Sequence, residues 1–92
     1  MLVKVKNLQG TAPRSPAGYT SWKEYWCAKS GRIWPSKCVV PGCYERAEVG
    51  AHVKLVYGNN NRWYILPLYY SHNNDHDAEF YVDDSYLVPV NY

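Results

Sequence analysis

Ten tyrosines and four tryptophans stand against a single phenylalanine in this 92-residue chain. Each Tyr or Trp side chain combines a large apolar ring with a polar tip that must reach water or a hydrogen-bond partner. A chain of this length buries only about 60–65% of the surface that its unfolded form exposes, so its apolar core is marginal. The sequence therefore predicts a single small domain, residues 1–92, that needs a source of stability besides its core.

Composition excludes two classes of protein. Apolar residues make up 47% of the chain and charged residues 20%, which excludes a chain that is disordered throughout. Apolar stretches such as residues 65–68 are far shorter than the roughly 20 residues that cross a bilayer, and the N-terminus lacks the apolar core of a signal peptide. We therefore expect a cytoplasmic protein.

Charge is distributed unevenly along the chain. Residues 1–62 hold ten basic and three acidic side chains, a net charge of +7, whereas residues 63–92 hold five acidic side chains and no basic one, a net charge of −5. Two interpretations remain open: the halves neutralise each other across the fold, or a basic side of the protein meets phosphate or an acidic partner.

Local patterns predict one short helix after an N-terminal arm. Residues 1–18 open with an alternating Val-Lys segment, a short strand at most, and continue as a loop or arm with Pro and Gly, which leaves residues 19–92 as the core. Ser21 and Glu24 form a capping-box pattern, and Gly31 ends a helix predicted over residues 20–30.

Extended segments follow the helix. Residues 48–57 alternate in polarity, residues 63–68 are largely apolar, and the Gly and Asn residues between them predict a β-hairpin. Residues 71–77 are expected to form a short helix or turn, and residues 80–82 and 87–90 two closing strands.

Four side chains have the spacing of a zinc site. Cys38 and Cys43 flank a Pro-Gly turn, and His72 and His76 follow after the hairpin. Structural zinc takes four Cys or His ligands in a tetrahedron, often one pair from a turn and one from the start of a helix. The pattern predicts a zinc ion bound by these four residues, which would supply the missing stability.

The alternative is that both cysteines are small buried apolar residues and both histidines are solvated loop residues. Cys27, His52 and Tyr69 are candidate fourth ligands in place of His76. His52 itself lies mid-strand, and alternation puts it on the polar face with Gly50 and Lys54. There it is either a general base or metal ligand, or a polar-face histidine bonded to a neighbour.

The order of turn, hairpin with a histidine in its first strand, and His-Asn resembles the HNH, or ββα-metal, nuclease superfamily in its treble-clef form. More closely, residues 17–91 resemble a family of small phage and bacterial proteins of uncharacterised function. The matching segments are Ala17-Gly18-Tyr19, Ser21-Trp22, Tyr25-Trp26, Cys38, Cys43, Ala47-Glu48-Val49-Gly50-Ala51-His52-Val53, Trp63-Tyr64-Ile65-Leu66-Pro67-Leu68, His72-Asn73 and Leu87-Val88-Pro89-Val90-Asn91.

The resemblance implies a small zinc-stapled α+β domain with an N-terminal helix, a zinc knuckle, a hairpin and a short helix. It would make His52 the general base of a nuclease and place Asn73 at the last histidine of the motif. Ala51 stands where the superfamily has a ligand of the catalytic metal, and Tyr69 stands where the closer family has a cysteine. Because phosphodiester cleavage needs a divalent ion as well as a base, these departures argue against nuclease activity.

We therefore expect a non-catalytic, zinc-stabilised module in the cytoplasm of a bacterial host, acting by contact with a macromolecule. The resemblance suggests a phage-encoded inhibitor of a host defence system, such as a CRISPR effector. The alternatives are an HNH-type nuclease and a nucleic-acid-binding protein that uses Lys37, Arg46, Lys54 and Arg62 on phosphates. Exposed Trp and Tyr are frequent interface anchors, and the candidate partner-binding residues are Trp34, Lys54, Arg62, Trp63 and Tyr70.

Overall fold

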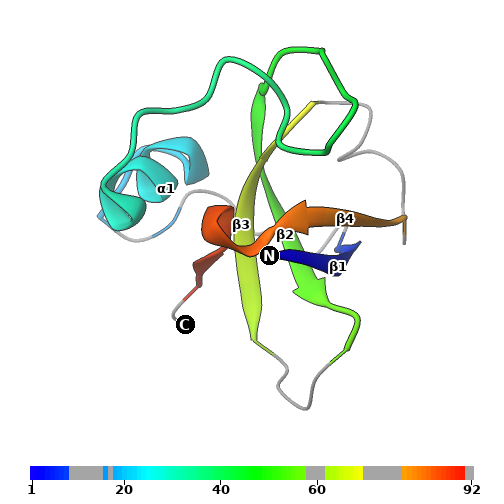
Figure 1. Cartoon of the computed structure of the whole chain (residues 1–92). Helices are drawn as coiled ribbons and strands as arrows, with labels where there is room; N and C mark the ends of the chain where they lie inside the picture. The colour runs from blue at the N-terminus through cyan, green and yellow to red at the C-terminus, as the bar shows by residue number, and fades with distance from the viewer. Residues whose placement is uncertain (9–15, 17, 58–61, 70–77, 91–92) are drawn as a thin grey trace.

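The computed structural model describes residues 1–8, 16, 18–57, 62–69 and 78–90. Its elements are, in chain order, β1 (Leu2–Asn7), α1 (Trp22–Ser30), β2 (Val49–Leu55), β3 (Trp63–Leu68), β4 (Glu79–Asp83), the 3-10 helix η1 (Asp84–Tyr86) and β5 (Val88–Pro89) (Figure 1). The α+β class predicted from the sequence is confirmed, because these elements make one five-stranded antiparallel sheet and one α-helix. No helix in the described ranges has the length and apolar content to cross a lipid bilayer.

The first strand lies inside the sheet, whose order is β4-β1-β2-β3-β5. β1 pairs with β4 from Leu2 to Lys6 and with the end of β2, and Val5 is fully buried. The short strand predicted at the start of residues 1–18 is confirmed, but it lies inside the sheet and not in an arm. The alternating Val and Lys residues do form a strand, and the strand is stable because it has a partner on each side.

The predicted hairpin is confirmed. β2 pairs with β3 from Val49 opposite Leu68 to Lys54 opposite Trp63. Three consecutive residues of β2, from Ala51 to Val53, are buried, so both faces of this hairpin are covered. A strand covered on both faces carries buried side chains at successive positions.

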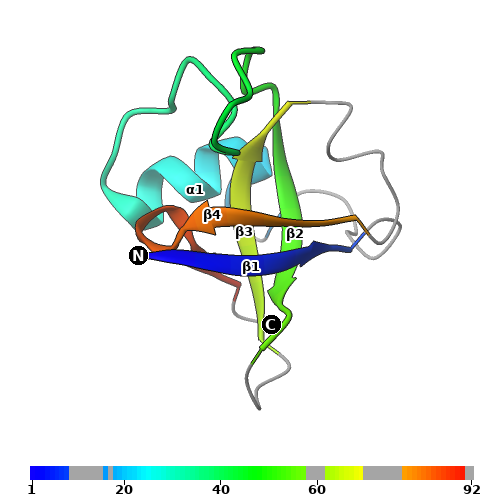
Figure 2. The ribbon, with the colours of Figure 1, turned by 45° about the vertical axis from the view of Figure 1, so that its right-hand side comes forward.

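The two faces of the hairpin have different coverings. Figure 2 shows β1 and β4 crossing β2 and β3, so one face lies against this second pair of strands. Side chains from all four strands and from the turn before β2 fill the space between them: Val5, Cys38, Ala51, Val53, Leu66, Leu68 and Val82. Such a crossing of strand pairs encloses a core without a second sheet.

Helix α1 covers the other face of the hairpin. The Ser21 Oγ accepts a hydrogen bond from the Glu24 backbone N–H at 3.1 Å, and Gly31 ends the helix in the left-handed region at φ 71°. The predicted N-cap at Ser21 and the predicted end at Gly31 are confirmed, and the helix begins at Trp22, two residues after the predicted start. The helix buries Tyr25 and Trp26 in a second apolar cluster with Ile65 and with residues at the C-terminal end of the described chain.

Residues 78–90 join the two edges of the sheet. β4 pairs with β1 at one edge, η1 turns the chain, and β5 pairs with β3 at the other edge. The Trp26 Nε1 donates to the Tyr86 carbonyl at 2.8 Å and the Tyr25 hydroxyl donates to the Pro89 carbonyl at 3.0 Å. The two predicted closing strands are thus confirmed, and α1 is bonded to the segment between them. The predicted short helix at 71–77 lies outside the described residues.

Candidate functional site

A hairpin-like turn brings the two cysteines of the predicted zinc site together. The Cys38 N–H donates to the Glu45 carbonyl at 2.9 Å, and the Cys43 N–H donates to the Val40 carbonyl at 3.0 Å. Between them Pro41 and Gly42 hold the central positions of a tight turn, and the φ of 87° at Gly42 requires glycine or asparagine there. The sequence therefore folds locally so that both thiols face one place.

The two thiols are in contact but differ in burial. Cys38 is 6% exposed, Cys43 is half-buried, and the Cys43 side chain lies within hydrogen-bonding range of Cys38. Burial raises the pKa of the Cys38 thiol above its ordinary value of 9.0, against a smaller lowering by the backbone of Tyr69. At neutral pH Cys38 is a protonated thiol, so metal binding there must release a proton.

Tyr69 links this turn to the segment that holds the predicted histidine ligands. Its backbone lies within hydrogen-bonding range of Cys38, and the Val39 N–H donates to the Pro67 carbonyl at 3.3 Å. The end of β3 therefore lies against the turn, and His72 follows Tyr69 by three residues.

Two of the alternative ligands lie in other parts of the fold than the two thiols. In the part of the chain that the structure describes, no three His, Cys, Asp or Glu side chains gather where a metal ion would fit. Cys27 packs in the cluster beneath α1, and His52 lies against Trp22 of the same helix, on the opposite face of the hairpin from Cys38. The structure therefore does not bring Cys27 or His52, the substitutes considered for His76, to the two thiols. His72 and His76 lie outside the described residues.

His52 is a core residue, which corrects its assignment to a polar face. It is 2% exposed, its ring meets the Trp22 ring edge-on at a centroid distance of 4.5 Å, and the Trp63 ring lies at 6.0 Å. Burial lowers the pKa of His52 to about 4. Alternation along the strand correctly gives the face on which His52 lies, but α1 covers that face.

The Gly-Ala-His-Val segment owes its pattern to packing. A Cβ atom at Gly50 would lie 2.9 Å from the Trp22 Cβ and 3.0 Å from the Trp22 carbonyl carbon, so only glycine lets α1 approach the strand this closely. Ala51 is buried on the other face, against the crossing strands. The Gly-Ala-His-Val segment, which resembles a nuclease motif, therefore allows α1 to pack closely against β2.

The predicted partner-binding residues are spread over the molecule. Trp34 is half-buried and donates from Nε1 to the Ala47 carbonyl at 2.8 Å. Trp63 is half-buried beside His52, opposite the half-buried Lys54. Arg62 is exposed, and Tyr70, like Asn73, lies outside the described residues. The two tryptophans thus serve the packing of the domain at least in part.

Sequence reasoning missed a set of cations laid on aromatic rings. The Arg32 guanidinium lies 4.6 Å from the centre of the Tyr86 ring, and Arg32 also donates to the Ser85 carbonyl at 3.1 Å. The Lys37 Nζ lies 5.4 Å from the centre of the Tyr44 ring. Arg32 and Tyr86 are far apart in the sequence, so only the return of the chain through η1 could reveal this pair.

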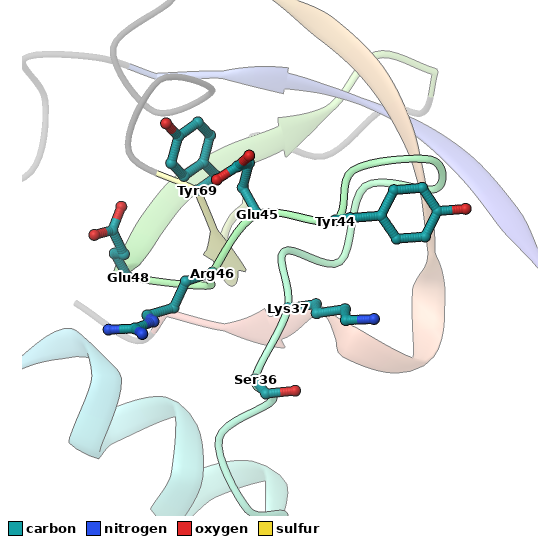
Figure 3. A pocket seen from close by; sticks show the side chains of 7 residues that line it. All are labelled: Ser36, Lys37, Tyr44, Glu45, Arg46, Glu48 and Tyr69. Atoms are coloured by element: carbon teal, nitrogen blue, oxygen red, sulfur yellow. The ribbon is translucent and has the colours of Figure 1, made fainter.

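Two hollows lie beside the cysteine turn. The larger, of about 760 Å³, has a lining of mixed charge: Ser36, Lys37, Tyr44, Glu45, Arg46, Glu48 and Tyr69. Figure 3 shows Lys37 and Tyr44 pointing to one side of this segment and Arg46 and Glu48 to the other. The second, a groove of about 550 Å³, is formed by residues 35–44 and Tyr86. Both are shaped by the turn that carries the cysteines.

Comparison with known proteins adds no family assignment. No protein-family model, no curated protein and no solved structure matches this chain.

Proposed function

We propose that this chain is a non-enzymatic binding module, held together by zinc, that acts by contact with a macromolecular partner. The observation that carries the proposal is the burial of His52, the residue that the resemblance to HNH nucleases would make the general base. A general base must reach the proton that it removes, directly or through one water. With Trp22 against its ring, His52 does not present a nitrogen to a phosphodiester outside the protein.

The zinc part of the proposal rests on the contact between Cys38 and Cys43. Two adjacent thiols at a tight turn match half of a tetrahedral zinc site, and the chain passes this turn at Tyr69 just before His72. We propose Cys38, Cys43, His72 and His76 as the ligands. In this proposal the turn and the hairpin make an HNH-like, treble-clef-type scaffold to which β1 and β4 are added. Zinc would supply folding free energy and would take no part in a reaction.

The partner in this proposal is a protein of nucleic-acid metabolism or host defence. This follows from the resemblance to small phage proteins, and an inhibitor of an RNA-guided nuclease is the role that the resemblance suggests. Exposed cationic and apolar side chains such as Arg32, Lys37 and Ile33, which is 92% exposed, offer the contacts that such a role needs.

Plasmid cleavage separates this proposal from the nuclease alternative. Purified protein is incubated with supercoiled plasmid and Mg²⁺ or Mn²⁺, and nicking is followed on a gel. We expect no nicking. Metal-dependent nicking that disappears in both His52→Ala and Asn73→Ala would contradict the proposal. The second variant is needed because His52→Ala leaves a cavity in the core and lowers stability for that reason alone.

A further inference from the structure

We infer that the groove between the cysteine turn and Tyr86 binds an acidic segment of a partner protein, with a bulky apolar side chain between carboxylates. The inference rests on the proposed binding function and names the surface and the chemistry of the partner. The groove has a volume of about 550 Å³, within the range of sites that hold several side chains of a ligand.

The groove has a lining of mixed polarity. Pro35, Val39, Val40 and Pro41 line it together with Tyr44 and Tyr86, beside the polar side chains of Ser36, Lys37, Cys38 and Cys43. The aliphatic side chains offer no hydrogen bonds, so they favour an apolar side chain of the partner. A lining that combines apolar and polar side chains is typical of a protein interface.

The rim of the groove is cationic. Lys37 belongs to the lining, and Arg32, which lies just outside it, stacks on the lining residue Tyr86. No Asp or Glu occurs among the described residues that line the groove. Asp83 and Asp84, which precede Tyr86, lie beside the N-terminal amine instead, at 3.7 Å and 3.5 Å. The rim therefore complements negative charge.

Both rim cations are held in place before a partner arrives. Arg32 is fixed by the Tyr86 ring and by its hydrogen bond to the Ser85 carbonyl, which leaves other N–H groups of the guanidinium for a carboxylate. Lys37 rests on the Tyr44 ring. Side chains that are ordered in advance lose less entropy on binding, and guanidinium–carboxylate pairs are among the stronger hydrogen-bonded pairs.

The same contacts disfavour nucleic acid as the occupant. Sequence-tolerant binding of single strands uses aromatic faces on which bases stack. Arg32 lies over the Tyr86 ring and Lys37 over the Tyr44 ring, so one face of each ring is taken by a cation. The apolar lining residues Pro35, Val39, Val40 and Pro41 are aliphatic, which suits a protein side chain better than a base.

Peptide selection tests the inference without a known partner. A displayed library of random 12-residue peptides is selected on the immobilised full-length chain, and the selected pool is sequenced. We expect enrichment of Asp or Glu on both sides of Leu, Ile or Phe. A pool without acidic enrichment, or no enriched peptide at all, would overturn the inference.

Variants then locate the peptide. A fluorescein-labelled peptide from the selected pool is titrated with the wild type and with each groove variant. Relative to the wild type, we expect the affinity to fall about tenfold in Arg32→Gln and about threefold in Lys37→Gln. Lys29→Gln is the matched control, because Lys29 also lies on a tyrosine ring but does not line the groove, and it is expected to bind like the wild type. Melting temperatures confirm that all variants are folded. Equal affinity of the wild type and both groove variants would overturn the inference.

Competition identifies the class of ligand. A DNA oligonucleotide is expected to leave the bound peptide in place at physiological salt, and full displacement would overturn the inference in favour of a nucleic-acid surface. The peptide experiments and the plasmid assay test different claims. A peptide that binds away from the groove contradicts the inference about the groove but not the proposed binding function. Plasmid nicking contradicts the proposed binding function, whatever the result with peptides.

Discussion

His52 shows how the surroundings of a single side chain decide its chemistry. In a strand, alternate side chains face opposite sides, and the sequence correctly puts His52 on the side away from Ala51. Which side of the strand is buried depends on where α1 packs, and no local sequence pattern predicts that packing. A histidine that sequence alone offers as a base is instead an uncharged core residue with a pKa of about 4.

The lowered pKa of His52 predicts a stability that falls in acid. The folded protein keeps His52 neutral down to about pH 4, whereas the unfolded chain takes up a proton near its ordinary pKa of 6.5. The contribution is therefore fully present above pH 6.5 and is lost progressively as the pH falls towards 4, by up to about 3 kcal/mol. Urea unfolding at pH 7 and pH 4.5 measures this loss.

His52→Gln serves as the comparison, because glutamine is polar and does not titrate. Other groups such as Asp83 titrate in both proteins, so the difference between the two pH profiles isolates His52. We expect a smaller loss of unfolding free energy between pH 7 and pH 4.5 in the variant. Parallel profiles in the two proteins would show that His52 is not the group responsible.

At the level of elements, the contact between α1 and β2 depends on the absence of a side chain at Gly50. Gly50→Ala places a methyl group against the Trp22 backbone, and the helix must shift to make room. We expect a loss of about 1–3 kcal/mol in unfolding free energy, measured by urea denaturation. Glu48→Ala, an exposed neighbour, is the control and is expected to stay within about 0.5 kcal/mol of the wild type. Wild-type stability in Gly50→Ala would show that α1 does not approach β2 this closely.

Elements with local signals could be predicted from the sequence, and those that depend on distant partners could not. The helix carries its own start at Ser21 and its own end at Gly31, and the hairpin strands are neighbours in the sequence. β1 looked like part of an arm because its partner β4 is about 75 residues away. The candidate site divides in the same way: the Cys38–Cys43 contact follows from a turn, whereas the pair of Arg32 and Tyr86 requires the whole fold.

At the scale of the whole molecule, the proposed zinc site predicts that the stability of the protein depends on bound metal. We expect about one zinc per chain by elemental analysis and a marked fall in melting temperature with a chelator. Zinc bound at full occupancy in the Cys38→Ser, Cys43→Ser double variant would contradict the proposed ligands. Tyr69→Cys adds a thiol next to Cys38, so the proposal also expects this variant to retain zinc at higher chelator concentrations than the wild type.

The joining of both sheet edges by residues 78–90 also orders the events of folding. Before this segment has been synthesised, β1 cannot pair with β4 and β3 cannot pair with β5. The side chains of Trp26 and Tyr25 also have no Tyr86 or Pro89 carbonyl to which they can donate. A growing chain can form the capped helix and the β2–β3 hairpin early, because their contacts are local. Closure of the sheet needs contacts between residues about 80 positions apart, so we expect it to follow the formation of the helix and the hairpin.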